Sequence, residues 1–276
     1  MSTTTFDERG GDHAASAKRS PATSSTWMLA RKETREIVRT WRIIVLPAIL
    51  LLFAVSSPLL AKYTPEIVTA LGGAQLGGLK LPEPTVYDAY AQWIKNVSQI
   101  GAFAIIIIYG GLVSSERKSG TAVLVLTKPA SRVAFVLVKY LVQVVYLAVL
   151  FALGALITWA VTAFTFGTAP AGALWASTAV WFVLAAFYLA LMVLFSVVIP
   201  AAAGAAGAGL GAYVVLAVAS AWPNVADYSP AGLSGRAASL AAHTHTDSAL
   251  WPVLITIGAI LVAVGAATLV FRRQEL

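Results

Sequence analysis

The chain has 276 residues, of which 59% are hydrophobic and only 11% are charged, and it contains no cysteine. A soluble domain carries about 25% charged residues, so this composition excludes a soluble globular protein and predicts a membrane protein, while the missing cysteines exclude disulfide bonds and thiolate metal sites. The net charge of +7 is better explained by basic residues beside membrane spans than by nucleic acid, which we do not expect as a partner.

Two different segments precede the first apolar run. Residues 1–26 are rich in Ser, Thr and Ala, which predicts a disordered tail. Residues 27–42 have helical periodicity, with apolar or neutral side chains on one face and charged side chains on the other. The first face holds Trp27, Ala30, Thr34, Ile37, Val38 and Trp41, and the second holds Arg31, Lys32, Glu33, Arg35, Glu36, Arg39 and Arg42. We predict an amphipathic helix lying in the membrane interface, and the alternative is a solvated basic flank of the first span.

The remaining residues, 43–276, contain six apolar stretches long enough to cross a bilayer as helices. Their predicted bounds are residues 43–60, 97–113, 136–164, 174–199, 201–221 and 251–271. Pro200 interrupts the longest apolar run, which predicts a tight turn there. Lys and Arg are concentrated beside the N-terminal helix, between the second and third spans, and at the C-terminus, so these three regions are expected in the cytoplasm. The predicted fold class is an all-α membrane protein with six transmembrane helices, an N-terminal interfacial helix and both termini cytoplasmic.

Two longer segments are expected on the opposite side. Residues 61–96 contain several Gly and Pro residues and end with Thr85-x-x-Asp88, a pattern typical of a helix start, so we predict a flexible loop and then a short interfacial helix through Trp93. Residues 222–250 are expected to re-enter the membrane edge in part. They include His243, His245 and Asp247, which could share one face of an extended strand and bind a metal. An ordinary solvated loop is the favoured interpretation, and we expect no metal site.

The spans contain little that could drive transport or catalysis. No Asp, Glu, Lys, Arg or His occurs between Lys139 and Asp227, although ion-coupled transporters usually keep ionisable residues within their spans. Lys118-Ser119 lacks the glycines of a phosphate-binding loop. The sequence therefore predicts a protein that is not an enzyme and takes its energy from a partner.

Residues 114–139 form the predicted cytoplasmic loop between the second and third spans. Glu116 lies four residues before Gly120, and a short apolar run at 123–126 could enter a groove on another protein. Lys128-Pro129 ends that run. This pattern favours a docking device, and the alternative is a loop that only carries the positive charge of the cytoplasmic side.

This loop resembles the one after the second span in ABC-2 type permeases, the membrane subunits of a group of ATP-binding cassette transporters. The likeness rests on Glu-Arg-Lys-Ser-Gly-Thr at residues 116–121, on Lys-Pro-Ala-Ser-Arg at 128–132, on the charged helix at 31–36 and on Phe-Arg-Arg at 271–273. It implies a dimer of permeases, two copies or a homologous pair, each docked on a separate ATPase subunit that binds ATP and Mg. It also implies that the loop forms a coupling helix carrying Glu116, Gly120, Thr121, Pro129 and Arg132.

The resemblance further implies an exporter in a cell membrane, which we interpret as the plasma membrane of a bacterium. Gly204, Gly207 and Gly211 lie at small-residue spacing in the fifth span and could pack helices closely, either in such a dimer or within one subunit. A membrane scaffold or assembly factor that transports nothing is the alternative function. An intramembrane enzyme or passive channel has less support in the sequence.

Overall fold

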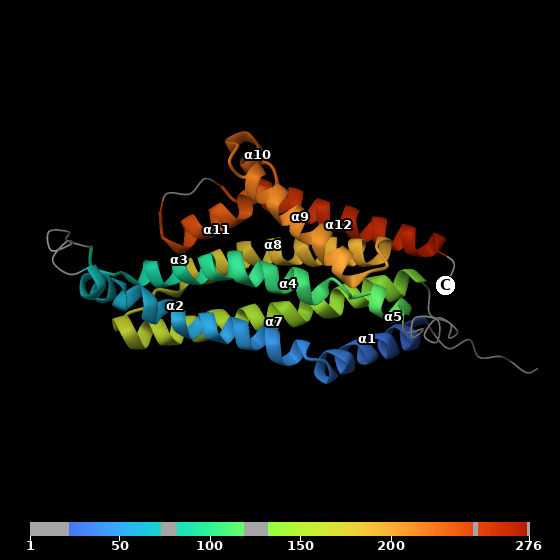
Figure 1. The fold of residues 1–276 in the computed structure, drawn as a ribbon, viewed down its shortest axis with the longest axis horizontal. Helices are drawn as coiled ribbons and strands as arrows, with labels where there is room; N and C mark the ends of the chain where they lie inside the picture. The colour runs from blue at the N-terminus through green and yellow to red at the C-terminus, as the bar shows by residue number, and fades with distance from the viewer. Residues whose placement is uncertain (1–21, 73–81, 119–131, 245–247, 275–276) are drawn as a thin grey trace, which may run out of the picture.

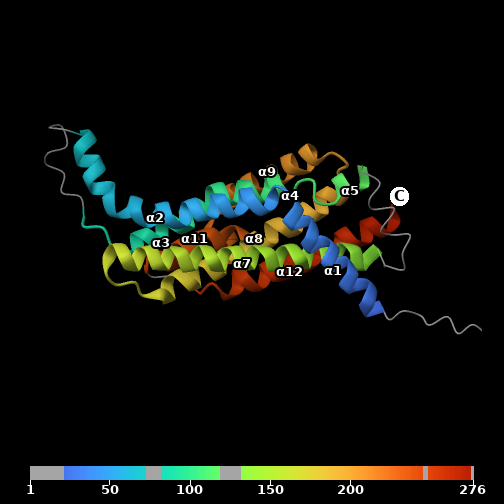
Figure 2. The same cartoon turned by 90° about the horizontal axis from the view of Figure 1, so that it is seen from below.

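The computed structural model describes residues 22–72, 82–118, 132–244 and 248–274. Within these ranges every regular element is a helix, and the long helices run side by side as an elongated bundle (Figures 1 and 2). Six helical segments are long and apolar enough to cross a membrane, which confirms the predicted fold class at this level. Five of them are single helices: α2 (Arg42–Gly72), α7 (Arg132–Phe166), α8 (Ala171–Val198), α9 (Ala202–Ala219) and α12 (Leu250–Arg273).

The remaining span, Val86–Lys118, is assembled from shorter pieces. They are α3 (Val86–Asn96), the π-helix η2 (Val97–Gly101), α4 (Ala102–Tyr109) and α5 (Ser114–Lys118). The predicted start signal is confirmed, because Thr85 and Asp88 form a reciprocal capping box at the beginning of α3.

The predicted short helix through Trp93 is therefore present as α3, but its expected position at a surface is wrong for Tyr90 and Trp93. Both side chains are fully buried, and the Trp93 indole donates a hydrogen bond to Thr178 Oγ1 of α8 at 3.3 Å. A buried indole needs a partner for its N–H, and α8 supplies one. The second span therefore begins at Val86, eleven residues before the start of its apolar run at Val97, and α3 is part of the core.

The turn between the fourth and fifth spans is confirmed. Helix α8 ends at Val198, and Ile199 and Ala201 have extended backbones before α9 begins. Helix α9 is then the least covered span: 11% of its apolar window is buried, against 67% for α8. A Cβ added at Gly207 or Gly211 would meet nothing within 4 Å, so these two glycines do not pack against other described parts of the chain.

Residues after α9 return to the bundle as α10 (Pro223–Asp227), the 3-10 helix η3 (Pro230–Gly232) and α11 (Leu233–Ala241). Helix α11 buries Leu233, Ala237 and Ala241 and packs against α8 and α3. The return is tight at Gly232, where a Cβ would lie 2.0 Å from the Ala226 carbonyl oxygen. Of the three residues considered for a metal, only His243 lies in the described part, stacked on Tyr87 with ring centroids 4.7 Å apart. His245 and Asp247 lie outside it.

One end of the bundle gathers the charged elements. Helix α1 (Ala22–Arg39), α5, the start of α7 and the end of α12 all lie there (Figure 1). Helix α1 begins at Ala22, inside the segment 1–26 for which the composition predicts a disordered tail, and it packs against α7 and α2. Elements far apart in the sequence are thus brought together at this end.

Candidate functional site

A buried lysine holds the charged end of the bundle together. Lys139 lies two turns into α7 and its side chain is fully buried. Its ammonium group contacts Glu33 Oε2 of α1 at 2.7 Å and Glu116 Oε1 of α5 at 2.7 Å. A charge removed from water needs such partners, because an unpaired buried ion costs several kcal/mol. Lys139 therefore fastens three separate helices at one point.

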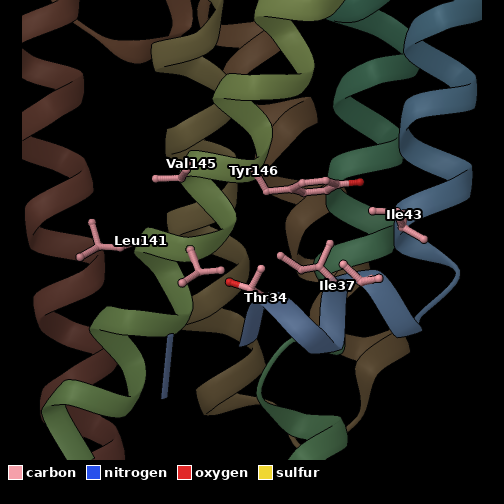
Figure 3. A pocket seen from close by; sticks show the side chains of 8 residues that line it. Thr34, Ile37, Ile43, Leu141, Val145 and Tyr146 are labelled. Atoms are coloured by element: carbon pink, nitrogen blue, oxygen red, sulfur yellow. The ribbon is translucent and has the colours of Figure 1, made fainter. Parts of the chain in front are cut away.

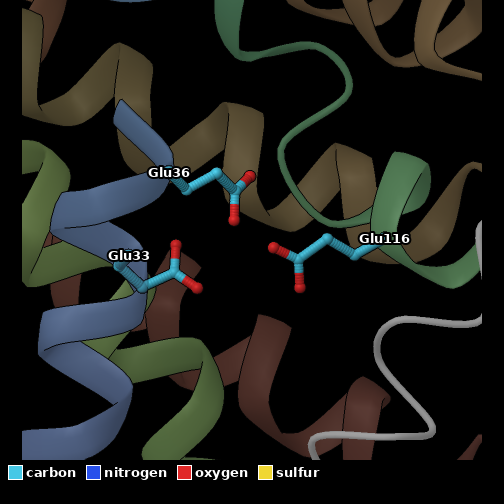
Figure 4. Close-up of side chains that lie close together, drawn as sticks. All are labelled: Glu33, Glu36 and Glu116. Carbon is cyan, nitrogen blue, oxygen red and sulfur yellow. The ribbon is translucent and has the colours of Figure 1, made fainter. Parts of the chain in front are cut away.

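A second lysine completes the cluster from the more exposed side. Lys32 Nζ lies 2.8 Å from Glu116 Oε1, 3.2 Å from Glu33 Oε1 and 3.4 Å from Glu36 Oε2. The three carboxylates point toward one another, two from α1 and one from α5 (Figure 4). The two ammonium groups balance much of this negative charge. The arrangement is accordingly an ion-pair network, which we call the Lys139 network: Lys32, Glu33, Glu36, Glu116 and Lys139.

An aromatic ring supports the two ammonium groups. The Phe135 ring centroid lies 5.4 Å from Lys139 Nζ and 5.9 Å from Lys32 Nζ, within the range of cation–π attraction. Phe135 is itself stacked on Phe271 of α12, with centroids 5.4 Å apart. Phe135 therefore connects the network to the last span.

Two partly buried members of the network in α1, Glu36 and Lys32, have shifted pKa values. Burial raises the pKa of the Glu36 carboxyl, as do a hydrogen bond with Glu116 and the negative charge there, while Lys139 opposes the shift. Burial lowers the pKa of Lys32, but the carboxylates of Glu33, Glu116 and Glu36 more than reverse this and raise it above its usual value. Lys32 is thus charged at neutral pH, and Glu36 is the group that holds its proton more tightly than in water.

We expect Glu36→Gln to stabilise the protein at neutral pH. A carboxyl with a raised pKa in the folded state binds more protons there than in the unfolded state, so stability falls as pH rises from its usual value of 4.5 through the raised pKa. Gln resembles the protonated acid and does not ionise, so the variant should not lose this stability as the pH rises. Thermal unfolding in detergent should therefore show a higher midpoint for Glu36→Gln at about pH 8, with the difference shrinking toward about pH 5. Glu66→Gln, at an exposed position of α2, is the matched control, and a Gln variant less stable at both pH values would contradict the expectation.

Helix α5 is anchored a second time, to the end of α8. Ser196 Oγ accepts hydrogen bonds from the backbone N–H groups of Val113 at 2.8 Å and Ser114 at 2.9 Å. Arg117 donates to the Val197 carbonyl oxygen at 3.0 Å. These bonds satisfy N–H groups at the helix start that would otherwise lack partners. The last described turn before residue 119 is therefore firmly placed.

The other flank of the loop is fastened as well. Arg132, the first residue of α7, donates to the carbonyl oxygens of Arg272 at 3.1 Å and Gln274 at 2.7 Å. Of the other residues assigned to the coupling helix, Gly120, Thr121 and Pro129 lie outside the described residues. Glu116 and Arg132 thus mark two fixed flanks on either side of residues 119–131.

The predicted faces of α1 need one correction. Trp27, Arg31 and Arg35 of α1 are exposed, which agrees with a surface helix, and Trp41 is exposed in the turn that follows α1. Glu33, however, is only 2% exposed and lies on the face that packs against the protein. The periodicity placed Glu33 with the arginines because all are charged, and it could not show that one of them had a buried partner.

Sequence reasoning also missed the role of Lys139, which was expected to face the cytoplasm. One signal was available: Lys139 is flanked by apolar residues on both sides, and a lone cation in such a helix requires a counter-ion. The acidic candidates in α1 and α5 were visible, but not the pairing.

Two comparisons relate the chain to known proteins. Residues 27–240 match the family model described as ABC-2 family transporter protein. A Bacillus subtilis (strain 168) protein described as uncharacterized transmembrane protein YxlG is 26% identical over 252 residues, which cover 90% of this chain and 97% of that protein. The family match includes α1, the Lys139 network and the first five spans.

Proposed function

The chain belongs to the ABC-2 family of transporter proteins, and we propose that it is the permease subunit of an exporter in the bacterial plasma membrane. Its partner would be a separate ATP-binding cassette ATPase that binds ATP and Mg, since this sequence has no phosphate-binding loop of its own. The chain itself would bind no cofactor and catalyse no reaction. Both termini and residues 114–139 would then face the cytoplasm, in agreement with the distribution of Lys and Arg.

We assign the ATPase docking surface to residues 119–131 and their two flanks. The observation that carries this assignment is the position of Lys139 between Glu33 and Glu116. A force applied to the loop would first reach α5, and the short charged contacts of Glu116 would pass it to α1 and α7. Such contacts resist separation because each would leave a buried charge without its partner.

The structure suggests different roles within the loop. Glu116 is 6% exposed and its carboxylate is engaged by two lysines, so we assign it to positioning rather than to direct contact with the ATPase. Gly120, Thr121 and Pro129 would supply contact or shape beyond α5, as the family resemblance implies. Arg132 would hold the second flank against the C-terminal end of α12.

A second permease copy, or a homologous permease, would cover α9. This helix exposes Val214, Val215 and Val218 beside Gly207 and Gly211, and small residues let helix backbones approach closely in lipid. The chain has no cysteine, so oxidation of a single Val215→Cys variant would produce a crosslinked dimer if this face is the interface. If active complexes showed no such crosslink, α9 would not be the dimer interface.

The proposal is tested with the affinity-tagged permease coexpressed with the ATPase encoded nearest to it. We expect the ATPase to copurify, Gly120→Leu to reduce that copurification, and Glu116→Gln to retain it while lowering permease-dependent stimulation of ATP hydrolysis about tenfold, as expected for a charged hydrogen bond worth about 1.5–3 kcal/mol. Glu66→Gln makes the same chemical change at an exposed position of α2, and it should leave both the copurification and the stimulation of ATP hydrolysis unaltered.

The outcomes also separate the alternatives. Unchanged copurification in Gly120→Leu together with unchanged stimulation in Glu116→Gln would overturn the docking site. If the chain is a membrane scaffold that transports nothing, a catalytic substitution in the ATPase should have no effect on the flux of any substrate across the membrane. Loss of flux in that experiment would exclude the scaffold.

A further inference from the structure

An apolar groove runs beneath helix α1 on the outside of the bundle. It encloses about 330 Å³, comparable with a small ligand site, and lies where α1 crosses α7 near the start of α2 (Figure 3). Its principal lining residues are Thr34, Ile37 and Val38 of α1 and Leu141, Val145 and Tyr146 of α7. We propose that this groove binds one acyl chain of an anionic phospholipid, whose headgroup is held by arginines of α1.

The lining of the groove suits hydrocarbon because its polar groups are already used. Thr34 Oγ1 donates a hydrogen bond to the Ala30 carbonyl oxygen at 2.9 Å. The Tyr146 hydroxyl donates to the Arg42 carbonyl oxygen at 3.1 Å and closes the groove toward α2. Both hydroxyl protons are therefore already used, and a polar ligand would find no free hydrogen-bond donor in these two side chains, whereas an acyl chain needs none.

The groove opens onto the surface of α7 that faces outward. Leu141 and Val145 line the groove and are exposed, and the exposed stripe continues through Val149, Leu153 and Leu156. These positions are about four residues apart, so they lie on one face of the helix. An acyl chain that enters the groove can accordingly continue along α7 with apolar contact.

The rim of the groove supplies the charge. Arg31, Arg35 and Arg39 form an exposed row along α1 and line a second hollow of about 540 Å³ on its adjoining face. Arg31 precedes Thr34 by three residues and Arg35 precedes Val38 by three, a spacing that makes side chains neighbours on a helix. The arginines thus stand beside the apolar groove, and guanidinium groups bind phosphate well. One amphipathic ligand with a negative headgroup matches both hollows.

A protein partner fits this position less well than a lipid. Helix α1 lies along the opposite edge of the bundle from α9, so a second copy against α9 would leave the groove uncovered (Figure 1). Trp27 of α1 and Trp41, in the turn between α1 and α2, are both exposed, and tryptophan is typical of the depth at which lipid headgroups meet hydrocarbon. The lipid site does not depend on an ATPase, and only the argument that the groove stays uncovered rests on the proposed dimer face at α9.

The test measures lipid binding to the delipidated full-length protein by native mass spectrometry, using phosphatidylglycerol and phosphatidylcholine with identical acyl chains. The first phosphatidylglycerol should bind at least tenfold more tightly, and Arg31→Gln combined with Arg35→Gln should weaken it about 25-fold, or about fivefold for each arginine. Arg272→Gln combined with Arg273→Gln removes the same charge at exposed positions of α12 and should have little effect. Inorganic phosphate should not compete.

A second pair of variants tests the groove itself. Val145→Trp fills it and should weaken the first lipid of either type, whereas Val149→Trp, one turn further along the exposed stripe, should not. Equal affinity for the two lipids, a preference that survives loss of Arg31 and Arg35, or unchanged binding to Val145→Trp would each overturn the proposal. Lipid binding that is detected only after deletion of residues 1–21 would also overturn the proposal, because those residues would then be the natural occupant of the groove.

Discussion

Replacing Lys139 by Met should lower the free energy of unfolding by about 3–5 kcal/mol, the usual cost of breaking a buried ion pair by removing one partner. The lysine is fully buried, and its ammonium contacts Glu33 and Glu116 at 2.7 Å each. Met has a similar length and keeps the apolar packing, so the loss comes from the two carboxylates left with only Lys32 to balance them. Denaturant or thermal unfolding in a fixed detergent measures the change.

Two comparisons make this expectation specific. Lys95→Met removes a charge at an exposed site of α3 and should change stability by less than about 0.5 kcal/mol. Adding Glu33→Gln to Lys139→Met removes one uncompensated charge and should recover part of the loss, since residues of one network are not additive. A Lys139→Met protein as stable as the original, or a double variant with the sum of both losses, would contradict the network.

Trp93→Ala should cost about 3–5 kcal/mol, as expected for a large aromatic side chain removed from a core. Trp93 is fully buried and donates to Thr178 of α8. Across the interface, a Cβ added at Gly154 of α7 would lie only 2.6 Å from the indole, so the ring fills the space between three helices. Substitution by Ala would leave a cavity and an unpaired Thr178.

This prediction distinguishes the two positions considered for Trp93. An interfacial tryptophan would be largely solvated or in contact with lipid, and its loss would matter little. Trp27→Ala provides that comparison within the same chain, because Trp27 is 71% exposed, and it should change stability by less than about 0.5 kcal/mol. Equal small effects at both sites would place α3 outside the core.

The Lys139 network places five ionisable residues at one end of the bundle. These five residues lie where α1, α5 and α7 meet. That arrangement suits a mechanical contact better than an ion pathway, because each lysine has at least one carboxylate partner on another helix. The proposed ATPase would act on this end, while the proposed lipid would bind on its outer flank.

Much of the fold followed from local sequence patterns. Apolar length located the six spans, Pro200 located the turn between α8 and α9, and the Thr85–Asp88 pair located the start of α3. Each of these signals acts over a few neighbouring residues or along one helix, so it can be read without a partner. The family resemblance also rested on short motifs, and the match over residues 27–240 agrees with it.

Tertiary structure decided which helix faces meet. Lys139 and Glu33 are 106 positions apart and Trp93 and Thr178 are 85 apart, and no local period relates them. In a membrane protein every span is apolar, so hydrophobicity identifies the helices but does not choose their neighbours. That choice depends on close packing and on satisfying each buried polar group, and both depend on the assembled bundle. The sequence alone therefore determined the six membrane-spanning stretches and the approximate position of most of them, whereas the packed structure determined that Trp93 is in the core and that Glu33 and Glu116 share one lysine.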